Sequence, residues 1–202
     1  MKFGTVQTKY AAGGILAHSL VCGRDRFRKG KVLDEKDIRR LIQFGYDDVV
    51  IARLEDNDTE ENLAAARVAE NIHFLAEPEN FKKSIAFTGR VNIFARTTGI
   101  IVFDEENLIK ANSIDNMITI ATIPNYSQVT KGSIVATIKI ISYGVITSNL
   151  ETVASLATGT IRLKRPKYLS AHLITTKISR GTSNKSLNAI KKRTDSLGLS
   201  LS

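Results

Sequence analysis

Two runs of β-branched residues limit the folds open to this chain more than any other feature of its sequence. Residues 117–123 read MITIATI and residues 133–141 read SIVATIKII, and such runs favour strands. Helix-type patterns flank them, at 59–75, after Asp104 and at 147–157. Strands and helices mixed in this way predict an α+β body.

The clearest helix signal in the first third of the chain begins at Asp34. Asp34 can cap the helix with Asp37 at the third helical position, and Gly45 ends it. The next segment, 47–54, alternates as a buried strand does. In the helix at 59–75, the apolar residues available for burial are Leu63, Ala66, Val68, Ala69 and Ile72.

The end of the sequence predicts the beginning of a second kind of domain. Residues 169–176 (LSAHLITT) are expected to form a strand and 182–198 a helix, and 199–202 start another apolar alternation. This order opens a doubly wound α/β domain, but about 34 residues are too few to cover its apolar faces.

The expected domain organisation follows from these patterns. An α+β body spans 1–157, either as one unit or as two lobes at 1–80 and 81–157. Residues 158–168 are expected to be a linker, because the charge balance changes there. An incomplete α/β domain occupies 169–202.

The positive charge of the chain is concentrated after residue 157. Residues 158–202 contain ten of the 29 lysines and arginines but only one of the 20 acidic residues, Asp195, so they hold the whole net charge of +9. This distribution suggests a phosphate-bearing or otherwise acidic partner, or else a solvated tail. Tyr168 is the only ring after Tyr143, which argues against nucleic acid as the partner.

Composition narrows the classes of protein to which this chain can belong. No apolar run approaches the roughly 20 residues that a membrane span needs. The N-terminal residues lack the pattern of a signal peptide, so we expect a cytoplasmic protein without membrane contact. The only cysteine is Cys22, and no group of cysteines and histidines has zinc-ligand spacing, so we predict no metal site.

The first candidate ligand site is the turn in AFTGRVNIFA, residues 86–95. Gly89 permits positive φ, and Arg90 can bind a phosphate or carboxylate through two hydrogen bonds. Thr88 and Asn92 complete the candidate group. The alternative is a β-bulge or hairpin whose Arg90 pairs with an acid such as Asp104.

The second candidate is the loop SRGTSNKS, residues 179–186, which follows the predicted strand and opens the predicted helix. Backbone N–H groups at the start of a helix can bind an anion. The alternative is an ordinary capped helix with surface lysines. The candidate ligand-binding residues here are Thr176, Lys177, Arg180, Thr182 and Ser183.

Three long segments resemble a known family. They are KFGTVQTKYAAGGILAHSL, RFRKGKVLDEKDIRRLIQFGYDDVVIARLEDND and AFTGRVNIFARTTGIIVFDEENLIKANSIDNMITIATIPNYSQVTKGSIVATIKIISYGV. Together they look like the N-terminal part of bacterial molybdopterin-binding proteins, relatives of the molybdopterin molybdotransferases. The resemblance covers residues 2–146. HLITTKISRGTSNKSLNAIKKRTDSLG resembles the first strand, loop and helix of the family's three-layer α/β domain, which holds the pterin phosphate.

The resemblance implies a role in molybdenum cofactor biosynthesis, with molybdopterin as ligand. In the family, the reaction joins molybdate to the pterin dithiolene, and the residues for it lie largely in the part of the α/β domain that this sequence lacks. The resemblance therefore implies a shortened, transferase-like protein and identifies no catalytic residue. Expected partners are a second copy of the chain or another protein of the pathway. The alternative is a non-catalytic interaction or oligomerisation module.

Overall fold

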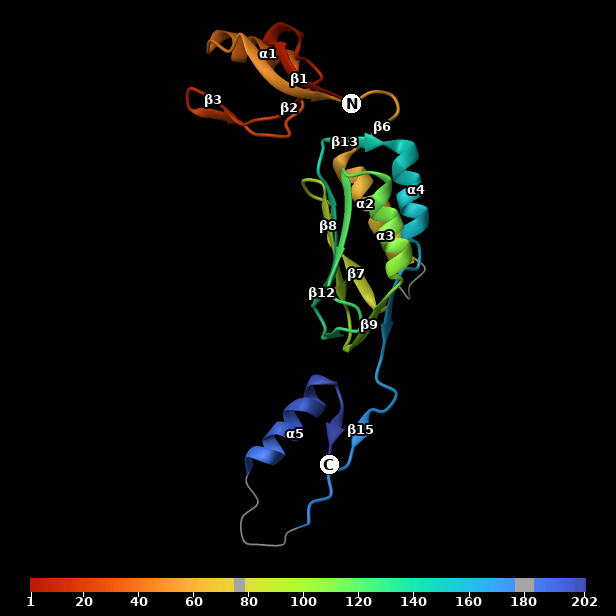
Figure 1. Cartoon of the computed structure of the whole chain (residues 1–202). Helices are drawn as coiled ribbons and strands as arrows, with labels where there is room; N and C mark the ends of the chain where they lie inside the picture. Colours follow the sequence, from red (N-terminus) through yellow and green to blue (C-terminus); the bar gives the residue numbers. More distant parts are fainter. Residues whose placement is uncertain (75–78, 177–183) are drawn as a thin grey trace.

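The structure is a computed structural model that describes residues 1–74, 79–176 and 184–202 (Figure 1). An N-terminal lobe, a central body and a small C-terminal unit follow one another along the chain. The described residues combine helices with many strands in small sheets. The predicted α+β class is confirmed.

The N-terminal lobe contains an antiparallel sheet of order β1-β5-β2 and a separate hairpin, β3–β4. It has its own hydrophobic core, in which Leu16, Leu33 and Leu41 are buried. Its elements are β1 (Lys2–Gln7), η1 (Thr8–Tyr10), β2 (Ile15–Leu16), β3 (Leu20–Cys22), β4 (Asp25–Phe27), α1 (Glu35–Gln43) and β5 (Asp48–Arg53).

Helix α1 begins where the sequence predicts. The Asp34 carboxylate accepts a hydrogen bond from the Asp37 N–H at 2.8 Å, and the Asp37 carboxylate accepts one from the Asp34 N–H at 3.0 Å. This is a reciprocal capping box. After the helix, Gly45 has a φ of +80°, which confirms its predicted role as the C-terminal stop.

The central body is built on a four-stranded antiparallel sheet of order β10-β12-β8-β7. A second sheet has the order β11-β9-β14, and β13 pairs with β6. The strands are β6 (Asp58–Glu60), β7 (Phe81–Lys83), β8 (Arg90–Ala95), β9 (Gly99–Phe103), β10 (Ile118–Thr122), β11 (Gln128–Val129), β12 (Ile134–Ile140), β13 (Gly144–Ile146) and β14 (Ile161–Lys164).

Three helices lie together on one side of the four-stranded sheet (Figure 1). They are α2 (Glu61–Phe74), α3 (Glu105–Ile114) and α4 (Thr147–Ala157). Helix α2 buries Ala64, Ala65, Val68, Ala69 and Ile72, whereas Leu63 is exposed. The prediction that Leu63 is buried was therefore wrong. The 3.6-residue period of a helix places position 63 outside the stripe formed by 64, 65, 68, 69 and 72.

The predicted linker needs a correction. Within 158–168, residues Ile161–Lys164 form β14, which pairs with β9, and Ile161 and Leu163 are buried in the body's core. The basic residues that suggested a linker alternate with these apolar ones and face outward, as period-two strands allow.

The C-terminal unit contains β15 (Ser170–Ala171), α5 (Asn184–Ser196) and β16 (Ser200–Leu201). The two strands are parallel. The strand predicted at 169–176 is shorter than expected, because β16 offers pairing only as far as Ser202, whose carbonyl accepts from Leu173 N–H at 2.8 Å. Its extension into a three-layer domain stays a prediction.

Several contacts connect the three parts, among them an ion pair of 2.6 Å between the Met1 amino group and Asp58 of β6. The Tyr143 hydroxyl of the body donates to the Ala17 carbonyl of the N-terminal lobe at 3.0 Å. At the other end, Gln128 Nε2 donates to the Ser196 carbonyl of the C-terminal unit at 2.8 Å. Among the described residues, none of the helices has the length and apolarity required to cross a bilayer.

Candidate ligand-binding site

The turn at 87–90 is a tight hairpin that leads into β8. Phe87 and Arg90 exchange two backbone hydrogen bonds, each of 3.1 Å. Between them, Thr88 has a φ of 48° and Gly89 a φ of 65°, the combination found in type I′ turns. A β-branched residue with positive φ is uncommon and strained, so Thr88 is held there by its surroundings.

Those surroundings use the backbone of Gly89. Its N–H donates to Asn62 Oδ1 at 3.0 Å, and its carbonyl accepts from the Ile140 N–H at 2.7 Å. A Cβ at this position would lie 2.8 Å from the Ile140 carbonyl oxygen. The turn therefore does not offer the Gly89 amide to an anion. It leaves the exposed side chains of Thr88 and Arg90 for a ligand.

The Glu61 side chain lies beside the turn and is influenced electrostatically by Lys29 of the N-terminal lobe. Its Oε2 lies 3.2 Å from the position that a Cβ on Gly89 would take. Burial, and secondarily the charge of Glu60, raise the pKa of the Glu61 carboxyl, while Lys29 of the N-terminal lobe acts in the opposite direction. The ammonium of Lys29 also lies 5.4 Å from the centre of the Tyr143 ring.

Strand alternation places Arg90 on the face of the sheet that the helices leave uncovered. Val91, Ile93 and Ala95 are buried, so Arg90, Asn92 and Phe94 face the other way. We call this surface the open sheet face. Its outward residues on the four strands are Lys82, Arg90, Asn92, Phe94, Thr119, Ala121, Ile134, Thr137 and Lys139.

Two cations stand directly opposite each other on this face. Arg90 pairs in register with Lys139 of β12, and both side chains are exposed. In the described parts of the chain, neither has a carboxylate within salt-bridge distance, and Asp104 instead caps α3 by accepting from Asn107 N–H. Like charges in this arrangement are unfavourable unless an anion joins them.

Polar and aromatic groups lie next to the two cations. The Thr137 hydroxyl donates to Asn92 Oδ1 at 2.9 Å, which leaves the Asn92 amide hydrogens for a ligand. Lys82 lies over the Phe94 ring at 5.4 Å. None of the nine outward residues of this face is acidic. The face can therefore hold a planar anionic ligand through its cations and its ring.

The other predicted site residues are not brought to this face. Thr176 is exposed in the C-terminal unit, whereas Gly89 contacts Asn62 of α2 in the body. The predicted residues Lys177, Arg180, Thr182 and Ser183 lie outside the described residues. Sequence reasoning missed Lys139 and Lys82, although the alternation in SIVATIKII could have placed Lys139 opposite its buried neighbours.

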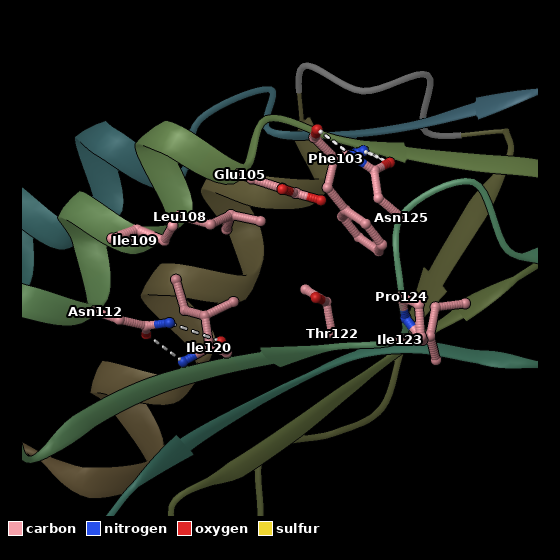
Figure 2. A pocket seen from close by; sticks show the side chains of 10 residues that line it. All are labelled: Phe103, Glu105, Leu108, Ile109, Asn112, Ile120, Thr122, Ile123, Pro124 and Asn125. Carbon is pink, nitrogen blue, oxygen red and sulfur yellow. Dashed lines mark hydrogen bonds between the residues drawn. The ribbon is translucent and has the colours of Figure 1, made fainter.

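A pocket of about 400 Å³ lies elsewhere in the body, between α3 and β10 (Figure 2). Two asparagines at its wall are committed to the fold: Asn125 binds the backbone of Phe103, and Asn112 binds the backbone of Ile120. Glu105 and Thr122 face the remaining space without a hydrogen bond to a described residue. One carboxylate and one hydroxyl do not form an activated nucleophile.

Side chains that can bind metal ions are not grouped in the described ranges. They contain no group of three or more histidine, cysteine or acidic side chains that could hold a metal ion. Cys22 is buried, and burial raises the pKa of its thiol. A buried thiol of this kind is a structural rather than a reactive cysteine.

Comparison with known proteins gives one match. A family model described as a domain of unknown function (DUF8806) matches residues 5–53, which run from β1 to β5. No curated protein and no solved structure matches the chain. The matched segment corresponds to the N-terminal lobe and excludes the open sheet face.

Proposed function

We propose that this chain binds a phosphorylated pterin of the molybdopterin type on the open sheet face, as a cytoplasmic protein of molybdenum cofactor biosynthesis. The observation that carries the proposal is the cross-strand pair Arg90–Lys139, which has no carboxylate partner among the described residues. Paired cations of this kind suit a phosphate group. The choice of a pterin as the ligand rests on the resemblance of residues 2–146 to molybdopterin-binding proteins.

The other groups of the face suit the rest of such a ligand. A pterin ring is flat and carries hydrogen-bonding edges. The Phe94 ring offers a stacking surface, and the Asn92 amide offers donors beside it. We propose binding and assign no catalytic step, because the groups on this face include no nucleophile with an adjacent base.

Fluorescence titration with a phosphorylated pterin tests the proposal. We expect saturable binding that Arg90→Ala and Lys139→Ala each weaken about tenfold, the loss of one charge-assisted hydrogen bond. Lys131→Ala is the matched control, because Lys131 is an exposed lysine of the same body in the turn before β12. Equal binding of the unphosphorylated pterin, or equal effects of all three variants, would contradict the proposal.

A second candidate function, an interaction or oligomerisation module, is favoured by a different observation. In the C-terminal unit, Leu169 is 75% exposed and Ile174 is 89% exposed. Among the described residues, the β15–β16 sheet has two strands, and the edges of such a sheet can pair with another chain. A second copy of the chain, or another protein of the pathway, would cover these groups.

A further inference from the structure

The β3–β4 hairpin of the N-terminal lobe carries the densest group of arginines in the chain. Phe27 of the hairpin is buried in the lobe's core, whereas Asp25 is exposed and forms an ion pair with Arg40 of α1. Arg26 alternates with Phe27 in β4 and is exposed. Arg24, in the turn before β4, and Arg28, just after it, are also exposed.

These three arginines line one depression of about 530 Å³. In the part of the chain that the structure describes, none of them lies within salt-bridge distance of a carboxylate. The nearby acids have other partners: Asp25 pairs with Arg40, and Asp37 pairs with Lys31 at 2.6 Å. The depression therefore has four cationic side chains and one carboxylate in its lining, and that carboxylate, Asp25, is paired with Arg40.

Ser19, Lys29 and Asp25 complete the lining. The Ser19 Oγ accepts a hydrogen bond from the Lys29 N–H at 3.0 Å, so the hydroxyl hydrogen of Ser19 is left to donate to a ligand. The volume falls within the range of about 300–1,000 Å³ that is usual for small-molecule sites. No aromatic side chain lines the depression, so it lacks the stacking surface that single-stranded nucleic acid uses.

We propose that this depression binds a small ligand with two or more neighbouring phosphate groups, such as pyrophosphate or the phosphate chain of a nucleotide. The planar fork of each arginine matches phosphate oxygens. The three arginine charges exceed the charge of about −1.5 to −2 that a single phosphate group carries near neutral pH. This site is separate from the open sheet face and does not depend on the proposed pterin function.

Isothermal titration calorimetry of the full chain with tripolyphosphate tests this site. We expect one saturable site that binds tripolyphosphate at least about tenfold more tightly than orthophosphate, because the additional phosphates reach further arginines. Arg26→Gln should weaken tripolyphosphate binding about tenfold, and Arg24→Gln should do the same. Titration with ATP then shows whether a nucleoside attached to the phosphate chain is accepted.

Arg39→Gln is the matched control, because Arg39 is an exposed arginine on α1 of the same lobe. It should leave binding unchanged. Three results would overturn the proposal: no saturable binding of tripolyphosphate, an equal loss in Arg39→Gln, or binding of a single-stranded oligonucleotide without binding of tripolyphosphate. A loss caused by Arg90→Ala instead of the hairpin variants would assign the anion to the open sheet face.

Discussion

Glu61 is an acidic residue at a favourable helix position whose charged form is nevertheless destabilised by burial in the folded chain. At the start of α2, an acidic residue is favoured by the helix dipole. Its neighbour Glu60 performs the capping, with its Oε2 accepting from the N–H groups of Asn62 and Leu63 at 2.8 and 3.0 Å. Glu61 is instead turned toward Gly89, where burial raises its pKa.

Glu61→Gln should therefore raise the melting temperature near neutral pH. A raised pKa in the folded state means that the folded chain binds more protons, so its stability falls as the pH rises through that pKa. Glutamine does not ionise, so the variant does not lose stability as the pH rises. Below the ordinary glutamate pKa of 4.5, wild type and variant should melt alike. Thermal unfolding at both pH values measures the difference, and Glu60→Gln, which weakens a cap, should lower the melting temperature instead.

Elements with strong local signals formed where the sequence predicted them. Helix α1 begins after its capping box, and α4 spans Thr147–Ala157, the predicted range. The errors were at Leu63 and in the linker. In both cases, the sequence contained a periodicity that was given less weight than composition: the helical period at Leu63, and the strand alternation at 161–164.

Leu163→Ala should destabilise the body by about 3 kcal/mol, the usual cost of truncating a buried leucine. Leu163 is 3% exposed and packs in the body's core from β14. Arg162→Ala changes an exposed side chain of the same strand and should have little effect. Chemical denaturation measures both. Similar stabilities of the two variants would contradict the assignment of this strand to the body.

The three parts of the molecule differ in how much hydrophobic core they bury. The N-terminal lobe and the body each bury a hydrophobic core. In the C-terminal unit, by contrast, most described side chains of α5 are exposed, with Thr194 buried. A strand pair with one helix buries too little apolar surface to be stable without further contacts.

If the C-terminal unit pairs with a second copy, sedimentation should show a dimer whose population rises with concentration. The double variant Leu169→Ser and Ile174→Ser removes the two most exposed apolar groups of residues 169–176, and should shift the equilibrium to monomer. Thr175→Ser, an exposed polar change in the same segment, is the control. A monomer at every concentration would contradict self-association and leave a different protein as the occupant.

The sequence by itself determined the mixed α+β class and the starts of its helices, because capping and period are local properties. It also indicated Gly89, since a tight turn needs positive φ. Only the tertiary structure decided that the Gly89 amide is used by Asn62 and that Arg90 meets Lys139 across the sheet. Those facts depend on strand register and on contacts between distant segments, which no local pattern specifies.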